Sequence, residues 1–379
     1  MPDPAAVLIA AVSGRALAAS ARRAGFVPLV ADCFGDDDTL ALAHAHVRLH
    51  PHQAFGIDAV ELLQALERLA IPHSPVGIVC GTGFEDRPTV LASIARRWRL
   101  LGNGPDTVAR LKTPASFSAL CRNAGVPHPQ TRVEPPAEMA GWVAKRAGGA
   151  GGTHVRGQIG RSEAVGSIYY QRRVAGSSVS ALVLGNGRAA LVLGFSAQWA
   201  APRKGRSFRY GGAVRPASLP SEMNTALTDA VERLASAVPL IGLNSFDFIV
   251  DDDAFWLLEI NPRPGATIDI FEPTDGSLFA LHVAACSGEL PERPLKLAGA
   301  AAACIVYADR DIRSVPAMEW PAWAADRQRP ATSIKTGDPF CTVFARAPIA
   351  AEAEQIVKQR AAAILAMLDT RLHDELSTH

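Results

Sequence analysis

Neither sign of charge dominates this sequence. Its 379 residues include 38 lysines and arginines against 37 aspartates and glutamates, which gives a formal net charge of +1. A chain with this balance lacks the general electrostatic attraction that draws proteins to nucleic acid or to acidic membrane surfaces. We therefore expect no nucleic acid and no membrane as a partner, and any effect of charge must be local.

Cysteines are sparse, and long apolar runs are missing. The six cysteines form no CxxC pair of the kind that marks a zinc or redox site, so we interpret them as reduced thiols. The apolar run Val7–Val12 is preceded by Asp3 and by no basic segment, which argues against a signal peptide. No stretch approaches the roughly 18 apolar residues of a membrane helix. These absences favour a cytoplasmic protein.

The first part of the chain alternates apolar strands with helical segments. An apolar run at 7–12 is followed by the turn Ser13–Gly14–Arg15, an alanine-rich helical stretch and a second apolar run at 26–32. Short continuous apolar strands suit a parallel sheet, so residues 1–102 are expected to form a doubly wound α/β domain. The turn lacks GxGxxG, and dinucleotide binding is not expected there. Ser13 and Arg15 either belong to a tight turn or contact an anionic substrate.

The pattern changes near residue 103. Helices are expected over 105–111, 114–124 and 222–238, and strands over 142–146, 153–159, 169–174, 178–185 and 189–199. Turn signals such as Gly185–Asn186–Gly187 join these strands as hairpins, which predicts antiparallel sheets of the α+β class. Residues 103–290 form the expected central region. Residues 291–379, with a strand and a final helix over 351–368, form a C-terminal region that completes or caps it.

A strand that carries a lysine leads directly into a glycine-rich loop. The segment Trp142–Arg146 contains Lys145, and the loop Gly148–Thr153 follows with four glycines. Lysine offers a compact positive charge for phosphate oxygens, and glycines let backbone N–H groups approach a triphosphate closely. The pattern is typical of a phosphate site, while a flexible hairpin is the alternative when the segment is taken alone.

Oxygen-bearing side chains lie on two successive strands near the end of the central region. Asp247 belongs to the first strand, and Glu259 and Asn261 end the second, in the segment LLEINPR. Residues two apart on a strand point to the same side, and a neighbouring strand can add a third ligand. Two carboxylates and an amide oxygen suit a hard cation such as Mg2+. The apolar residues before Glu259 predict that this carboxylate is partly buried and needs a partner.

Together, the lysine strand, the glycine loop and the segment Glu259–Arg263 resemble the ATP-grasp superfamily. The resemblance implies a pre-ATP-grasp N-terminal domain and antiparallel sheets that enclose the nucleotide. It implies ATP and Mg2+ as cofactors, with Mn2+ as an alternative ion. It also implies that a substrate carboxylate and ATP form an acyl phosphate, which an amine then displaces. The expected partners are therefore a small carboxylate and an amine, and a homodimer is one expected assembly.

The resemblance also assigns roles to individual residues. Lys112 and Lys145 match the nucleotide-binding lysines, and Arg263, with Lys145, matches the catalytic groups that steady the transferring phosphoryl group. The flap over the phosphates corresponds to Gly149, Gly151, Gly152 and Thr153. The segment on the adenine side corresponds to Gln171, Arg173 and Val174. The metal ligands correspond to Asp247, Glu259 and Asn261. Arg172 stands where the family usually has an acidic residue, so adenine contacts are expected only from main-chain atoms near Arg173 and Val174.

Two further groups of charged residues have alternative interpretations. Arg203, Lys204, Arg206 and Arg209 form a basic loop that either receives an acidic substrate or is simply solvated. His282, within the apolar segment LFALHVAAC, is expected to be a packed core residue rather than a catalytic base.

A narrower resemblance rests on the N-terminal segment and the form of the glycine loop. Residues 12–39 and the sequence GAGGTHV resemble archaeal and methylotroph ATP-grasp proteins that are predicted carboligases, a group that includes tyramine–glutamate ligases of methanofuran biosynthesis. The resemblance implies a carbon–nitrogen ligase of cofactor biosynthesis that joins glutamate to an amine such as tyramine. A non-catalytic ATP-binding regulator is one alternative. An ATP-grasp enzyme of another reaction type, carboxylation or thiol ligation, is the other.

Overall fold

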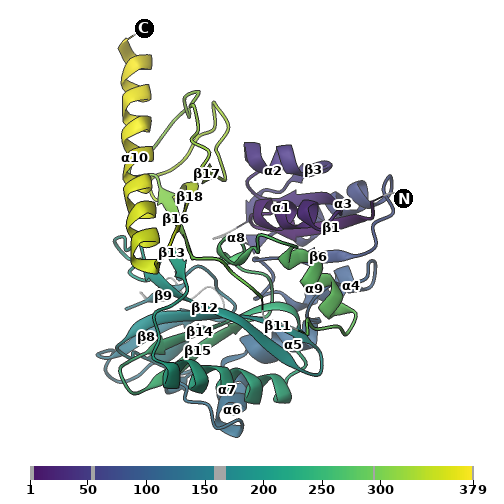
Figure 1. Cartoon of the computed structure of the whole chain (residues 1–379), viewed down its shortest axis with the longest axis vertical. Coiled ribbons are helices and arrows are strands. Elements are labelled where there is room, and N and C mark those ends of the chain that lie inside the picture. The colour runs from purple at the N-terminus through teal and green to yellow at the C-terminus, as the bar shows by residue number, and fades with distance from the viewer. Residues whose placement is uncertain (1–3, 53–55, 158–167, 293–294, 378–379) are drawn as a thin grey trace.

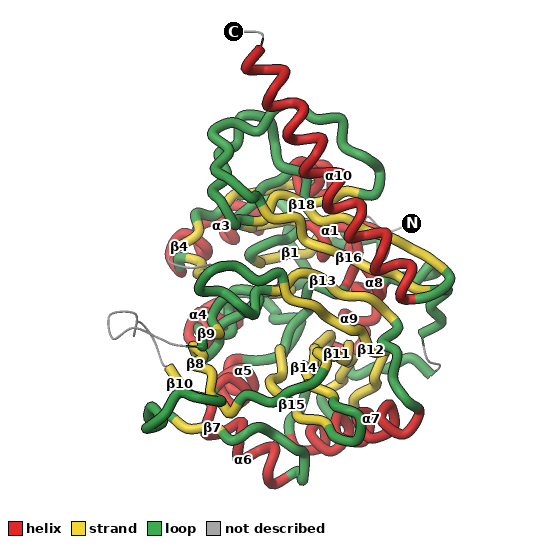
Figure 2. The backbone as a smooth tube through the Cα atoms, turned by 90° about the vertical axis from the view of Figure 1, so that its left-hand side faces the viewer, coloured by secondary structure: helices red, strands yellow, loops and turns green. Residues whose placement is uncertain are grey.

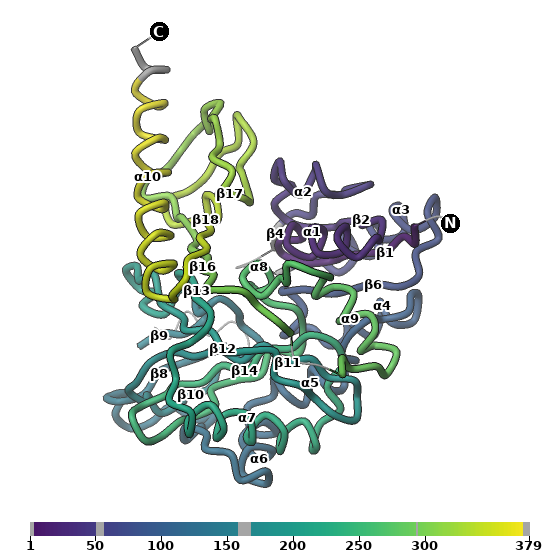
Figure 3. The backbone as a smooth tube through the Cα atoms, in the orientation of Figure 1, coloured from purple at the N-terminus to yellow at the C-terminus, as the bar shows by residue number. Residues whose placement is uncertain are grey.

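Three sheets of four or more strands organise the residues that the computed structural model describes, namely 4–52, 56–157, 168–292 and 295–377 (Figure 1). The N-terminal part of the chain and its C-terminal part lie on the same side of the central part, as the course of the chain in Figure 3 shows. No helix among the described residues combines the length and the apolar character that crossing a membrane requires.

The N-terminal sheet is parallel, as the strand–helix alternation predicts. Its strands are β1 (Ala6–Ala11), β2 (Val27–Asp32), β3 (Ala45–Arg48) and β6 (Ile78–Cys80), in the order β3-β2-β1-β6. Its helices are α1 (Arg15–Arg23), α2 (Asp37–Leu42), α3 (Ala59–Ala70) and α4 (Pro88–Ala95), and β4 (Pro51–His52) pairs with β5 (Gly56–Ile57). In α3, Leu62, Ala65 and Leu66 recur at helical spacing and are buried, while Asp58 caps the first turn by accepting main-chain N–H groups.

The second sheet is small and antiparallel, and it carries the predicted lysine strand. Its strands are β7 (Thr131–Arg132), β8 (Trp142–Arg146), β9 (Val155–Arg156) and β10 (Ile168–Arg172), in the order β7-β10-β8-β9. Helices α5 (Pro105–Lys112) and α6 (Pro114–Asn123) precede it. Of the strand expected over 153–159, Val155–Arg156 is present, and residues 158 and 159 lie outside the described residues.

The largest sheet combines the central and C-terminal parts of the chain. Its strands lie in the order β15-β14-β11-β12-β13-β16-β18-β17. They are β11 (Ser177–Asn186), β12 (Ala190–Ala200), β13 (Tyr210–Arg215), β14 (Ile241–Val250), β15 (Phe255–Asn261), β16 (Ala300–Tyr307), β17 (Ala324–Ala325) and β18 (Pro339–Ala347). Its helices are α7 (Ser221–Ala237), α8 (Ile268–Phe271), α9 (Leu278–Cys286) and α10 (Ala350–Ser377). Because β16 pairs antiparallel with β13, the C-terminal strands extend the sheet. Helix α10 runs beyond the predicted 351–368, since neither proline nor glycine follows to end it.

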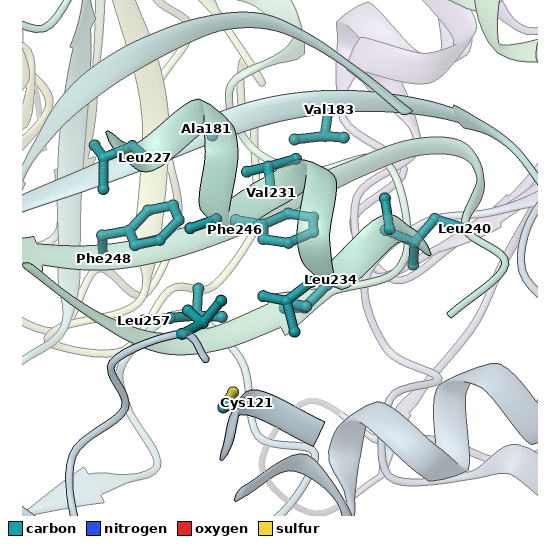
Figure 4. Packing of buried hydrophobic residues seen from close by; sticks show 14 of the residues in the cluster. Cys121, Ala181, Val183, Leu227, Val231, Leu234, Leu240, Phe246, Phe248 and Leu257 are labelled. Carbon is teal, nitrogen blue, oxygen red and sulfur yellow. The ribbon is translucent and has the colours of Figure 1, made fainter. Parts of the chain in front are cut away.

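Both faces of the largest sheet are covered. One face packs against α7, where Leu227 and Val231 recur at helical spacing and join Phe246 of β14 in a buried cluster (Figures 2 and 4). On the other face, Leu182 and Leu243 belong to a second buried cluster that includes side chains of β1, α1, α8 and α9. The largest sheet therefore meets the N-terminal domain through this second face.

Arg15 connects the N-terminal domain to two later parts of the chain. Its Nη1 lies 2.5 Å from Asp269 Oδ1, and its Nε lies 2.9 Å from Asp326 Oδ1. Burial opposes the charge of this guanidinium, but the two carboxylates outweigh it and raise the pKa of Arg15. Arg15 is thus held in structural ion pairs, and this geometry does not support its interpretation as a substrate contact.

We expect Arg15→Ala to lower the free energy of unfolding by about 3–5 kcal/mol, because it leaves two largely buried carboxylates without their cation. Chemical denaturation followed by circular dichroism measures the change. Arg68→Ala is a matched control on the exposed side of α3 and should shift the value by less than about 0.5 kcal/mol. Equal midpoints for Arg15→Ala and the unmodified chain would contradict the role of this residue as a connection.

Candidate active site

Strand pairing brings the predicted metal ligands together. Asp247 of β14 lies directly opposite Glu259 of β15, and Asn261 lies opposite Ser245. Directly opposed residues of antiparallel strands share a face, so the three oxygen-bearing side chains lie on one surface. Asn261 Nδ2 donates to Asp247 Oδ2 at 2.9 Å, and Ser180 Oγ donates to Asp247 Oδ1 at 2.6 Å. The surface that the sequence predicts is present, while metal binding by these residues stays a prediction.

Lys112, at the end of α5, lies against this group. Its Nζ donates to Asn261 Oδ1 at 2.6 Å and lies 3.5 Å from Glu259 Oε2. Burial acts to raise the pKa of Glu259, but Lys112 and Lys145 hold the pKa of this carboxyl well below its usual range. For Asp247 the balance is reversed, because burial and the neighbouring Glu259 raise its pKa. A divalent cation would favour the charged form of both carboxylates.

Lys145 approaches the same region from the second sheet. Its side chain is 4% exposed, and its Nζ donates to Gln171 Oε1 at 3.3 Å and lies 5.8 Å from the ring centroid of Tyr169. Burial opposes its charge, yet Tyr169 and the carboxylates Glu259 and Asp247 raise the pKa of Lys145. Lys145 therefore stays protonated, and its charge acts on the carboxylate pair from the opposite sheet.

A cavity of about 350 Å³, open to solvent, lies between these elements. Lys112, Arg146, Gln171 and Glu259 are among its lining residues. Arg146 Nε and Gln171 Nε2 are buried donors without a hydrogen-bond partner among the described residues. Buried donors that lack acceptors are unfavourable, so a ligand rich in acceptors would be stabilised here. Phosphate oxygens and adenine nitrogens are such acceptors, and the residues present therefore fit ATP.

The loop Gly148–Thr153 is closely packed at two of its glycines. Gly148 has a φ of +68°, and a Cβ there would lie 2.5 Å from the Cα of Asp86 in the N-terminal domain. Gly152 also has a φ of +68°, and a Cβ there would lie 1.8 Å from the carbonyl oxygen of Phe208. Only glycine fits at these two positions, which explains why the loop beside the cavity carries them.

The other predicted flap residues lie in the same loop. The carbonyl oxygen of Gly151 accepts a hydrogen bond from the N–H of Tyr210 at 3.0 Å, which ties the loop to the start of β13. Gly149 packs on the ring of His154, and Thr153 Oγ1 donates to a main-chain carbonyl at 3.4 Å. Phosphate binding by these residues stays a prediction.

The region that holds these residues matches a known protein family. The family model described as the ATP-grasp domain matches residues 115–267, which include the lysine strand, the glycine loop and both strands that carry the predicted metal ligands. The chain carries an ATP-grasp domain. A curated D-alanine–D-alanine ligase of Nitratidesulfovibrio vulgaris (strain DP4) is 33% identical over 107 residues, which are 26% of this chain. This alignment spans only 35% of the length of that relative.

Solved structures share the ATP-grasp fold over most of the chain. A biotin carboxylase from Campylobacter jejuni has a TM-score of 0.70 at 16% identity and covers 90% of this chain and 87% of its own. An N5-carboxyaminoimidazole synthetase from Staphylococcus aureus, complexed with ADP, has a TM-score of 0.68 at 14% identity, with 94% and 97% covered. The biotin carboxylase domain of Hydrogenobacter thermophilus 2-oxoglutarate carboxylase, with MgADP, has a TM-score of 0.72 at 14% identity, with 93% and 89% covered. The predicted fold class is confirmed.

Glu85 lies in the candidate site but is not among the residues that the sequence predicts. Arg263 donates from Nε to Glu85 Oε1 at 2.7 Å. Glu85 is 3% exposed, its other oxygen accepts the N–H groups of Gly83 and Phe84, and Arg263 and Lys112 lower its pKa despite burial. Glu85 thus fixes the guanidinium that is predicted to steady the phosphoryl group. The position of Glu85 just beyond β6 is the sequence feature that could have identified it, because ligand sites commonly lie at the carboxyl ends of parallel strands.

A second cavity, of about 380 Å³, lies between the ATP-grasp and N-terminal domains, and Glu85, Arg263 and His282 line it. His282 Nδ1 accepts from the N–H of Leu243 at 2.9 Å, and its Nε2 donates to the carbonyl of Leu101 at 3.0 Å. Burial lowers the pKa of His282 to about 4, so the ring is neutral. The prediction that His282 is a packed core residue is confirmed.

In the segment predicted to contact adenine, Arg172 and Arg173 already make contacts within the protein. The guanidinium of Arg172 lies 5.6 Å from the ring centroid of Trp142. The main-chain N–H of Arg173 donates to the carbonyl of Gly141 at 2.8 Å. That donor is therefore taken, and the carbonyl of Arg173 and the main chain of Val174 remain the proposed adenine contacts.

The basic loop between β12 and β13 is tied to the C-terminal strands. Arg209 is buried, its guanidinium lies 3.6 Å from the ring centroid of Tyr307, and its Nη1 donates to the carbonyl of Gly337 at 2.9 Å. Arg203 donates to the neighbouring carbonyl of Thr336. Arg209 is therefore a buried structural residue, which neither interpretation of the basic cluster describes, whereas Arg203 is exposed and holds the loop by a hydrogen bond.

Proposed function

We propose that this chain is an ATP-dependent carbon–nitrogen ligase that activates a carboxylate as an acyl phosphate and transfers the acyl group to an amine. The observation that carries the proposal is the shared surface of Asp247, Glu259 and Asn261, opposite the buried Lys145. A carboxylate–amide cluster facing a buried cation is suited to a magnesium-bound triphosphate. The ADP held by two structures of the same fold supports this nucleotide. The similarity to a D-alanine–D-alanine ligase supports an amine as acceptor.

In this proposal the cationic side chains position the nucleotide. Lys112 and Lys145 bind its phosphate oxygens, and the glycine loop excludes water from them. Arg263, held by Glu85, stabilises the charge on the transferring phosphoryl group. Mg2+, held by Asp247, Glu259 and Asn261, would neutralise the phosphates, and Mn2+ would suit the same oxygen ligands.

The reaction requires positioning rather than a side-chain nucleophile. A carboxylate oxygen of the substrate attacks the γ-phosphorus in line, and the bond to ADP breaks. The amine then attacks the carbonyl carbon, the bond to phosphate breaks, and the amine loses a proton. We propose glutamate as the carboxylate and a tyramine-like amine, in cofactor biosynthesis in the cytoplasm, on the strength of the N-terminal resemblance. A homodimer is the assembly that we propose to test.

A substrate screen tests the proposed function. The purified chain is incubated with ATP, Mg2+, a panel of carboxylates that includes glutamate, D-alanine and bicarbonate, and a panel of amines that includes tyramine. We expect ADP release that needs both a carboxylate and an amine, with the amide detected by mass spectrometry. Hydroxylamine in place of the amine should trap the activated carboxylate as a hydroxamate.

Other outcomes would select other functions. AMP in place of ADP would contradict an acyl phosphate. Turnover with bicarbonate and no amine would indicate carboxylation, and product with a thiol alone would indicate thiol ligation. ATP binding without turnover under any combination would indicate a regulator that has kept only the nucleotide site.

A further inference from the structure

Tyr210, the first residue of β13, carries a buried hydroxyl without a hydrogen-bond partner among the described residues. Burial, then the neighbouring Tyr307 and Asp247, raise the pKa of this phenol, so the hydroxyl keeps its proton and is available as a donor. A shielded O–H group that finds no acceptor in the protein is unfavourable. Its position is therefore explained best by an acceptor that a substrate supplies.

A bulge in β13 places Tyr210 on the same face of the sheet as the predicted metal ligands. Tyr210 pairs with Ala200 of β12, but Trp199 pairs with Gly212, so Gly211 is the extra residue. Without the bulge, Tyr210 would point to the opposite face, because side chains alternate along a strand. With it, Tyr210 shares the face of Ala200, and hence the face of the polar side chains described next.

That face carries a row of polar residues across neighbouring strands. Ser196 lies four residues before Ala200 on β12 and pairs with Ser180 of β11, which pairs with Asp247 of β14. Paired residues share a face, and so do residues two or four apart on one strand. Tyr210 therefore stands on the same face of the sheet as Asp247, beyond the two serines.

The main chain of Tyr210 is fixed on both sides. Its N–H donates to the carbonyl of Gly151 in the glycine loop at 3.0 Å, and its carbonyl accepts from Tyr307 Oη at 2.6 Å. Tyr307 is in turn covered by the guanidinium of Arg209. These contacts hold Tyr210 beneath the loop that is predicted to cover the phosphates, so the ring has a defined position.

We propose that Tyr210 contacts the substrate and donates a hydrogen bond to an oxygen of its carboxylate, both before phosphorylation and in the acyl phosphate. This proposal rests on the proposed function. Lys112 and Lys145 are proposed to bind the phosphates of the nucleotide. Tyr210 lies elsewhere, toward the N-terminal domain and close to Asp269, the ion-pair partner of Arg15. A neutral donor suits an oxyanion there without adding charge to the site. The phenol keeps its proton throughout, while the O–P bond forms and ADP leaves.

Tyr210→Phe tests the proposal, since it removes one oxygen and keeps the ring. With the carboxylate and amine found by the screen, we expect kcat/KM for the carboxylate to fall by about 10–100-fold, the loss of one hydrogen bond to a charged group. The Kd for ATP, measured by calorimetry, should stay within about twofold. Tyr170→Phe is the matched control. Tyr170 pairs with Ala144, on the face of the second sheet opposite to Lys145, and should keep full activity.

Each other result overturns the proposal in a recognisable way. Unchanged kcat/KM in Tyr210→Phe would show that the hydroxyl does not contact the carboxylate. Weaker ATP binding would place the hydroxyl in the nucleotide site instead. A lowered melting temperature with unchanged kcat/KM would show a structural role alone. If the unmodified chain releases no ADP with any carboxylate, the proposed function itself fails, and that result is seen before any variant is made.

Discussion

Glu259→Gln is expected to lower ATP-dependent ADP release by about a thousandfold or more, since a metal ion contributes several kcal/mol of charge stabilisation in the transition state. Glutamine keeps the shape of the side chain but removes the charge that is proposed to bind Mg2+. The fold should persist. Lys112 keeps its 2.6 Å hydrogen bond to Asn261, and the repulsion between Glu259 and Asp247 disappears. Steady-state assays over a range of Mg2+ concentrations measure the effect.

Glu222→Gln serves as the control for this substitution. Glu222 lies on the exposed first turn of α7, on the far side of the sheet from the site, so the same glutamate-to-glutamine change can be made there. Its activity should stay within about twofold of the unmodified chain. Near-normal turnover of Glu259→Gln at low Mg2+ would remove Glu259 from the metal site and with it the main support for the proposed function.

The shared surface of the predicted metal ligands could be predicted from the sequence, because it depends on the alternation of side chains along two neighbouring strands. Glu259 and Asn261 lie two apart on one strand, and the short turn after β14 makes the two strands antiparallel neighbours. The lysine strand and the glycine loop are equally local. Their packing, by contrast, involves Asp86 and Phe208, which no spacing in the loop itself indicates.

Contacts between distant segments were not predictable from spacing. Arg15 was interpreted as a turn residue or a substrate contact, but its partners Asp269 and Asp326 lie 254 and 311 residues away in the chain. Glu85 and Arg263 are 178 residues apart and come from different domains. In both cases a charged residue becomes buried when two domains pack, and the pairing follows from the need of a buried charge for a partner.

The position of Tyr210 depends on a different kind of information. Strict alternation along β13 predicts that Tyr210 faces away from the metal ligands, and one extra residue at Gly211 reverses this. A glycine pair such as Gly211–Gly212 is compatible with a bulge but does not require one. The register had to be observed before the hydroxyl could be assigned to the site.

Lys145→Met should weaken ATP binding by about 10–100-fold, because it removes a buried charge that is proposed to bond the phosphates. Methionine fills most of the same volume, so the second sheet should keep its structure, although Gln171 loses a donor. Calorimetric titration with ATP gives the Kd, and ADP release should fall below detection. Lys335→Met, at an exposed position in the C-terminal region, is the control and should bind ATP normally. An unchanged Kd would show that Lys145 is structural.

Titration with ATP in the absence of Mg2+ distinguishes direct phosphate binding by Lys145 from metal binding by Glu259. In the presence of a chelator, Lys145→Met should still bind ATP more weakly than the unmodified chain, because Lys145 is proposed to contact the phosphates directly. Glu259→Gln should bind ATP at least as tightly as the unmodified chain, because one negative charge near the triphosphate is gone. Changes of opposite sign in the affinity for ATP of these two variants would be hard to produce by general destabilisation. Equal weakening in both variants would instead indicate a shared structural effect.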